Sequence, residues 1–167
     1  SLDLSLLSEN VIKVLFEPRF AFKPDLSHTP EFRGRVEYWR QGNQDFLQES
    51  YTGMNKANQQ PPKVPILSGR RDAPYICIDP VFMERPDDNT GAHAFEALKK
   101  ALDTNLLDVA LSAGDVVFVD NSRVIHGRRA FTPRYDGADR WLKRFNLTSD
   151  LRKSFLVRGG DSRRLIF

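Results

Sequence analysis

The second half of the chain holds short β-branched and aromatic runs separated by turn-forming residues, a succession that strongly constrains the fold. Residues 116–119 read Val-Val-Phe-Val, which is too short for a helix and typical of a buried strand. Strand-like runs follow at 123–129 and 140–147, and Pro-Arg-Tyr-Asp-Gly at 133–137 predicts a turn between them. Because strands without regularly interleaved helices favour a sandwich or barrel, the expected fold is mainly β with flanking helices.

The first half of the chain predicts helices and two further strands. Apolar residues at helical spacing, with serines able to cap the start, predict a short helix within 3–16. Short strands are expected at 63–67 and 74–79. The clearest helix is expected over 91–112. Its apolar stripe consists of Phe95, Leu98, Leu102, Leu106 and Val109.

Residues 23–63 are predicted to form long loops. They contain four prolines and three glycines, with clustered Asn and Gln between occasional aromatic residues. Long irregular segments in compact domains often act as lids over a site, although such a composition also fits disorder. The segment is therefore described as lid-like, with both interpretations open.

Composition indicates one ordinary domain and excludes several classes of function. A chain of 167 residues that is 40% apolar is long enough to bury a core. Its 25 basic and 22 acidic residues are interspersed, so no nucleic-acid interface is expected. The single cysteine, Cys77, and the lack of a signal-peptide pattern or a bilayer-spanning apolar run favour a cytoplasmic protein without membrane contact.

The stretch 120–144 carries polar residues that a purely structural strand would not need. Arg140 and Arg144 share one face of their strand, about 13 Å apart along the backbone, so each can hold a different anion. The planar guanidinium of arginine matches a carboxylate in a bidentate geometry. His126 lies in the preceding strand, where a histidine taken alone is more often a hydrogen-bonded structural group than a metal ligand.

This stretch resembles a known enzyme family. The sequences Asp-Asn-Ser-Arg-Val-Ile-His-Gly-Arg at 120–128 and Asp-Arg-Trp-Leu-Lys-Arg at 139–144, with the turn between them, look like the distal half of the clavaminate-synthase-like (TauD-like) iron(II)/2-oxoglutarate oxygenases. The similarity is greatest to the arginine and asparagine hydroxylases of peptide-antibiotic pathways. The resemblance implies that residues 1–167 are the C-terminal portion of a single oxygenase domain, part of a double-stranded β-helix of the jelly-roll or cupin type.

The resemblance also implies a reaction and roles for four residues. The reaction is hydroxylation of an unactivated carbon of a free L-amino acid, with Fe(II), 2-oxoglutarate and O2, in secondary metabolism. His126 would be the distal iron ligand, and Arg140, fourteen residues later, would bind the distal carboxylate of 2-oxoglutarate. Arg144 would bind the substrate carboxylate, and Asp79 the substrate amino group or a side-chain nitrogen. A guanidinium facing Asp79 favours L-arginine or an arginine-like substrate.

The other metal ligands of the family have no counterpart in the sequence. A facial triad needs two histidines and one carboxylate. The histidines are His28, His93 and His126, and neither of the first two is followed by an acid two residues later. The expected partner is therefore an N-terminal segment, absent from this chain, that carries the proximal His-X-Glu/Asp pair.

Simpler interpretations of the same residues stay open. Asp79 could end a strand and cap a turn, and Arg140 or Arg144 could form structural ion pairs. The alternative function is a noncatalytic jelly-roll module that binds an amino acid or oxoacid without metal, which the absent proximal ligands favour. A basic protein-interaction domain is a third possibility, and the interspersed charges argue against it.

Overall fold

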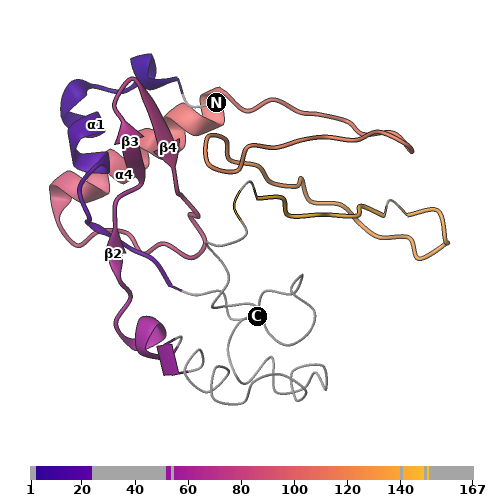
Figure 1. Ribbon diagram of the computed structural model, residues 1–167, viewed down its shortest axis with the longest axis horizontal. Helices are drawn as coiled ribbons and strands as arrows, with labels where there is room; N and C mark the ends of the chain where they lie inside the picture. The colour runs from indigo at the N-terminus through magenta and orange to yellow at the C-terminus, as the bar shows by residue number, and fades with distance from the viewer. Residues whose placement is uncertain (1–2, 24–51, 54, 140, 149, 151–167) are drawn as a thin grey trace.

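A computed structural model describes residues 3–23, 52–53, 55–139, 141–148 and 150 (Figure 1). The elements are η1 (Leu4–Leu6), α1 (Glu9–Leu15), β1 (Phe20–Ala21), β2 (Lys63–Val64), β3 (Leu67–Arg70), β4 (Ala73–Ile76) and α4 (Asn89–Thr104). Figure 1 shows α1, α4 and the β3–β4 hairpin gathered together, with the chain after α4 projecting away from them. None of the helices in the described residues combines the length and apolar character needed to cross a membrane.

α1 and α4 each begin at a side-chain cap. The Ser8 hydroxyl accepts the amide hydrogen of Val11 at 3.4 Å at the start of α1. The Asp88 carboxylate accepts that of Gly91 at 2.7 Å at the start of α4. This hydrogen bond is the main reason that the pKa of Asp88 lies below its usual value, and the nearby guanidinium of Arg19 lowers that pKa further. The short first helix predicted within 3–16 is confirmed.

The strands form two antiparallel pairs. β1 pairs with β2, with Phe20 opposite Val64. β3 and β4 form a hairpin, so the strands predicted near 63–67 and 74–79 are confirmed in part. Gly69 has a φ of +80°, and a Cβ there would lie 3.0 Å from the ring of Tyr75. Both the backbone conformation and the nearby ring therefore favour glycine at this position.

The core lies where α1, α4 and the hairpin meet. Its largest fully buried side chains are Phe20, Leu15, Ile66, Leu67 and Leu98. The ring of Phe20 packs against that of Phe95, with centroids 6.1 Å apart. Burying each such side chain contributes roughly 1.5–3 kcal/mol. This cluster joins the N-terminal helix to the strands that lead toward the candidate site.

The helix predicted over 91–112 ends earlier than expected. Phe95, Leu98 and Leu102 are buried as predicted, but α4 stops at Thr104, and Leu106 and Val109 are exposed. The apolar stripe therefore does not continue past the end of α4. The sequence Asp-Thr-Asn at 103–105 explains the stop, because these residue types are weak helix formers.

The predicted strands after α4 are extended chain that is not paired into a sheet in the described residues. We call residues 106–139 and 141–148 the extended arm (Figure 1, salmon to orange). The buried strand expected at 116–119 is wrong, since Val116 is 77% and Phe118 82% exposed. The described parts of 123–129 and 140–147 are likewise not strands. A strand needs a neighbour to satisfy its backbone groups, and no described segment lies against the arm in that way.

Several sequence predictions fall on residues outside this description. Residues 24–51 and 54, most of the lid-like segment, and Arg140 lie outside the described residues. Residues 55–59 are helical, although the sequence predicted loops there. Their Asn-Lys-Ala-Asn-Gln sequence tolerates a helix, which stops before the two prolines that follow.

Candidate functional site

Asp79 follows β4 and organises the turn after it. One carboxylate oxygen, Oδ1, accepts the amide hydrogen of Val81 at 3.0 Å. Its backbone carbonyl accepts those of Phe82 at 3.1 Å and Met83 at 2.8 Å. The capping role considered from sequence is therefore present, and Asp79 is half-buried. The second oxygen, Oδ2, makes no hydrogen bond to another described residue.

His126 lies in the extended arm, just after a tight turn. The Asp120 side chain accepts the amide hydrogen of Ser122 at 3.0 Å. The backbone carbonyl of Asp120 accepts the amide hydrogen of Arg123, also at 3.0 Å. The carbonyl of Ser122 in turn accepts the amide hydrogen of Ile76 at 2.9 Å. This bond ties the end of β4 to the turn before His126, so the chain segments that lead to Asp79 and to His126 are joined. The imidazole itself is exposed.

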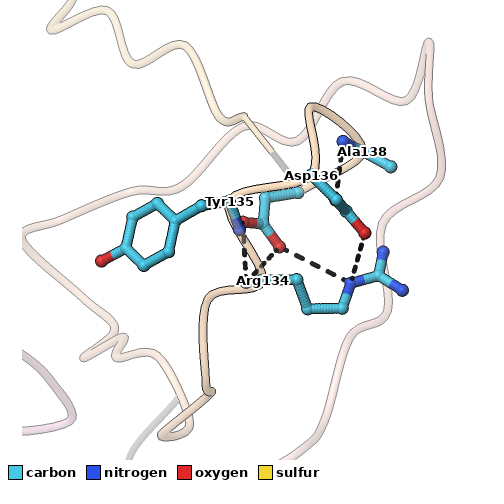
Figure 2. Close-up of polar contacts among 5 residues, drawn as sticks. Arg134, Tyr135, Asp136 and Ala138 are labelled. Carbon is cyan, nitrogen blue, oxygen red and sulfur yellow. Dashed lines mark hydrogen bonds and ion pairs between the residues drawn. The ribbon is translucent and has the colours of Figure 1, made fainter.

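A carboxylate-held loop precedes the predicted 2-oxoglutarate arginine (Figure 2). The Asp139 carboxylate accepts the amide hydrogens of Arg134 at 3.0 Å and Tyr135 at 2.8 Å. Asp136 accepts that of Ala138 at 2.9 Å and lies 3.3 Å from the Arg134 guanidinium. Tyr135 takes a left-handed conformation, φ +56°, which these hydrogen bonds stabilise. The turn was predicted, whereas the capping role of Asp139 was missed.

Arg144 is exposed and makes one side-chain hydrogen bond, from Nε to Oδ1 of Asn146 at 3.3 Å. It forms no ion pair with any acid in the part of the chain that the structure describes. Arg129 differs, because it binds Asp108 through two hydrogen bonds of 2.7 Å. This pair lowers the pKa of Asp108 and raises that of Arg129. Arg129 is therefore engaged within the arm, while the terminal nitrogens of Arg144 are available to an anion.

The donor set in the described residues does not fit a complete iron site. No three His, Cys, Asp or Glu side chains among them gather into a group that could hold a metal ion. A facial triad requires two histidines and a carboxylate on one side of the metal. Within the described residues, His126 can supply one ligand of such a set.

The chain is similar to characterised oxygenases over most of its length. The family model for "Taurine catabolism dioxygenase TauD, TfdA family" matches residues 40–146. The L-ornithine/L-arginine 3-hydroxylase of Catenulispora acidiphila is 39% identical over 158 residues, which cover 93% of this chain and 46% of that enzyme. The chain thus spans about half the length of the curated relatives it matches.

Solved structures agree with the sequence comparison. Non-heme iron oxygenase OrfP in complex with Fe, succinate and (3S)-hydroxy-L-Arg superposes with a TM-score of 0.81 at 41% identity, covering 99% of this chain and 48% of that one. The structure of OrfP in complex with Fe and alpha-ketoglutaric acid superposes with a TM-score of 0.75 at 40% identity. The match covers 99% of this chain and 44% of that one. The family expected from the residues around His126 is confirmed, and the backbone follows the fold of that family. The chain belongs to the TauD, TfdA family of dioxygenases.

Proposed function

We propose that this chain forms the distal part of the active site of an iron(II)- and 2-oxoglutarate-dependent oxygenase that hydroxylates an unactivated carbon of a free L-amino acid. The substrate is L-arginine or an arginine-like amino acid. The observation that carries this proposal is the 39% identity, over 93% of the chain, to an enzyme named for hydroxylation of ornithine and arginine. A double-stranded β-helix fold, a cytoplasmic setting and a place in secondary-metabolite biosynthesis belong to the same proposal.

Four residues carry the binding roles in this proposal. His126 is the distal iron ligand, and Arg140 binds the distal carboxylate of 2-oxoglutarate. Arg144 binds the α-carboxylate of the substrate, and Asp79 pairs with its amino group or a side-chain nitrogen. The bound iron and 2-oxoglutarate supply the oxidising chemistry, so these side chains act by positioning the two organic molecules.

The geometry of two of these residues supports their roles. The guanidinium of Arg144 keeps its terminal nitrogens free of described acids, and these nitrogens form the fork that a carboxylate accepts in a bidentate geometry. Asp79 is held at Oδ1 by the amide of Val81, which fixes its orientation and leaves Oδ2 for a cationic nitrogen. An acid pre-positioned in this way favours a substrate with a positively charged side chain or amino group.

The remaining metal ligands are proposed to come from a polypeptide segment outside this chain. The only histidines, His28, His93 and His126, include none with an acid two residues later. The chain also spans 46% of the Catenulispora enzyme. Residues 1–167 are therefore proposed to be the C-terminal portion of one oxygenase domain, with the proximal His-X-Glu/Asp pair in the N-terminal portion.

The test is arginine-stimulated release of succinate by the chain co-expressed with the portion of the Catenulispora enzyme that it does not match. We expect turnover that requires Fe(II) and 2-oxoglutarate and is abolished by His126→Ala. Arg144→Gln should raise the KM for arginine roughly 10- to 100-fold, the loss expected for a charge-assisted hydrogen bond of about 1.5–3 kcal/mol. Lys143→Gln, which removes the charge of the neighbouring cation that lies over the Trp141 ring, is the control and should leave KM unchanged. Turnover that survives His126→Ala would contradict the proposal.

A metal-free binding module is the second candidate, favoured by the lack of a three-donor metal group among the described residues. In that case the co-expressed chains would bind arginine or 2-oxoglutarate but release no succinate at any iron concentration.

A further inference from the structure

The turn after β4 is held against the β1 segment by paired backbone hydrogen bonds. The amide of Lys23 donates to the carbonyl of Phe82 at 2.8 Å, and the amide of Glu84 donates to the carbonyl of Ala21 at 2.9 Å. The residues between these two bonds form a single antiparallel bridge. Because β1 also pairs with β2, the turn is attached to a segment that is itself held in place.

Asp79 belongs to the turn that this pairing holds. Its Oδ1 accepts the amide hydrogen of Val81, and its backbone carbonyl accepts those of Phe82 and Met83. The Met83 side chain is in turn buried in the core. Because these bonds join Asp79 to the residues that follow it, the contacts that hold residues 82–84 also determine where the Asp79 carboxylate lies.

A side-chain contact joins the same two segments. The ammonium group of Lys23 and the carboxylate of Glu84 form an ion pair. Their side chains are 44% and 46% exposed, so water screens the pair and its contribution is that of a surface ion pair. The backbone hydrogen bonds remain when the pair is removed, so its loss should loosen the turn without unfolding it.

We propose that the Lys23–Glu84 ion pair positions Asp79 for the substrate, because it holds the turn at 79–84 against the β1 segment. Lys23 and Glu84 act through Asp79 and do not touch the substrate, so they are positioning residues. An acid that is already ordered loses less conformational freedom when it pairs with a cationic nitrogen. The substrate role of Asp79 rests on the proposed function, whereas the link between the ion pair and the turn does not.

Hydrogen exchange of the full chain, followed by NMR without iron or 2-oxoglutarate, tests this link. In Glu84→Gln the amides of Phe82 and Met83 should exchange about two- to fivefold faster, the factor expected for the loss of an exposed ion pair. Glu96→Gln is the matched control, because Glu96 pairs with Lys99 on α4 and its side chain is 52% exposed. The control should leave exchange in the turn unchanged. Unchanged exchange in Glu84→Gln, or equal acceleration in both variants, would overturn the proposal.

Reversal of the two charges shows whether the pair itself is responsible. Lys23→Glu and Glu84→Lys each place like charges side by side, so each should accelerate exchange in the turn. The double variant restores opposite charges and should return the exchange rates to within about twofold of those of the unaltered chain. Accelerations that simply add in the double variant would contradict a direct interaction between the two side chains.

Kinetics of the co-expressed enzyme separate positioning from a merely structural role. Glu84→Gln should raise the KM for arginine about two- to fivefold and leave the KM for 2-oxoglutarate unchanged, because Asp79 is proposed to face the substrate. Equal rises in both KM values would indicate a general loss of structure and overturn the positioning role. A KM for arginine that rises in Asp79→Asn but not in Glu84→Gln would overturn it while the proposed function stands. If Asp79→Asn leaves that KM unchanged, the proposed substrate role of Asp79 is wrong, and positioning for the substrate falls with it.

Discussion

Leu98→Ala is expected to destabilise the chain by about 2.5–5 kcal/mol. Leu98 is fully buried (0% exposed) on the inner face of α4, in the cluster that includes Leu15 and Phe20. The substitution removes three carbons, a loss of about 2.4 kcal/mol at roughly 0.8 kcal/mol per methylene. The cavity left behind adds to this loss, because tightly packed neighbours relax only in part.

Urea unfolding followed by helical circular dichroism measures the effect. With a slope of about 2 kcal/mol per molar urea, the midpoint should fall by roughly 1–2.5 M. Leu107→Ala is the matched control, since it is the same substitution at a side chain that is 88% exposed in the arm. It should change the free energy of unfolding by less than about 0.5 kcal/mol. Similar losses in the two variants would refute the division into a packed core and an unpacked arm.

Two further predictions concern carboxylates. In the folded protein the pKa of Asp88 lies below its unfolded value near 3.8, so its charged form stabilises α4. This contribution is complete above the unfolded pKa and is lost as the pH falls through the folded pKa. Asp88→Asn should therefore unfold with a weaker acid dependence below about pH 4 in a circular dichroism titration, and an unchanged acid dependence would contradict this. Asp139→Ala frees the amides of Arg134 and Tyr135 and so loosens the loop that precedes Arg140. The co-expressed enzyme should therefore show a raised KM for 2-oxoglutarate. Asp139→Asn, which keeps an acceptor oxygen, should restore part of the loss, and an unaltered KM in Asp139→Ala would exclude this positioning role.

The sequence predicted the local structure where local interactions decide it. Ser8 caps α1, and Phe95 and Leu98 face the core from α4, as helical spacing indicated. The turn near 133–137 was also expected from its proline and glycine. In each case the determining contacts lie within a few residues or along one helix face, so the pattern alone is sufficient.

The arm shows where such patterns fail. The Val-Val-Phe-Val run at 116–119 has high β-propensity, but a strand forms only when a neighbour accepts its hydrogen bonds. The described residues hold no such neighbour, so propensity alone predicted a burial that is absent. The sequence left open whether Asp79 caps a turn, and the structure shows that it does, because its Oδ1 and its backbone carbonyl accept amide hydrogens of residues 81–83.

Calorimetric titration of 2-oxoglutarate into the co-expressed protein shows whether its binding depends on iron held by His126. We expect binding that requires Fe(II), with little heat in the iron-free protein and in the iron-loaded His126→Ala variant. Equal affinity with and without iron would rule out the iron-dependent oxygenase and identify the arginines as a metal-free oxoacid site.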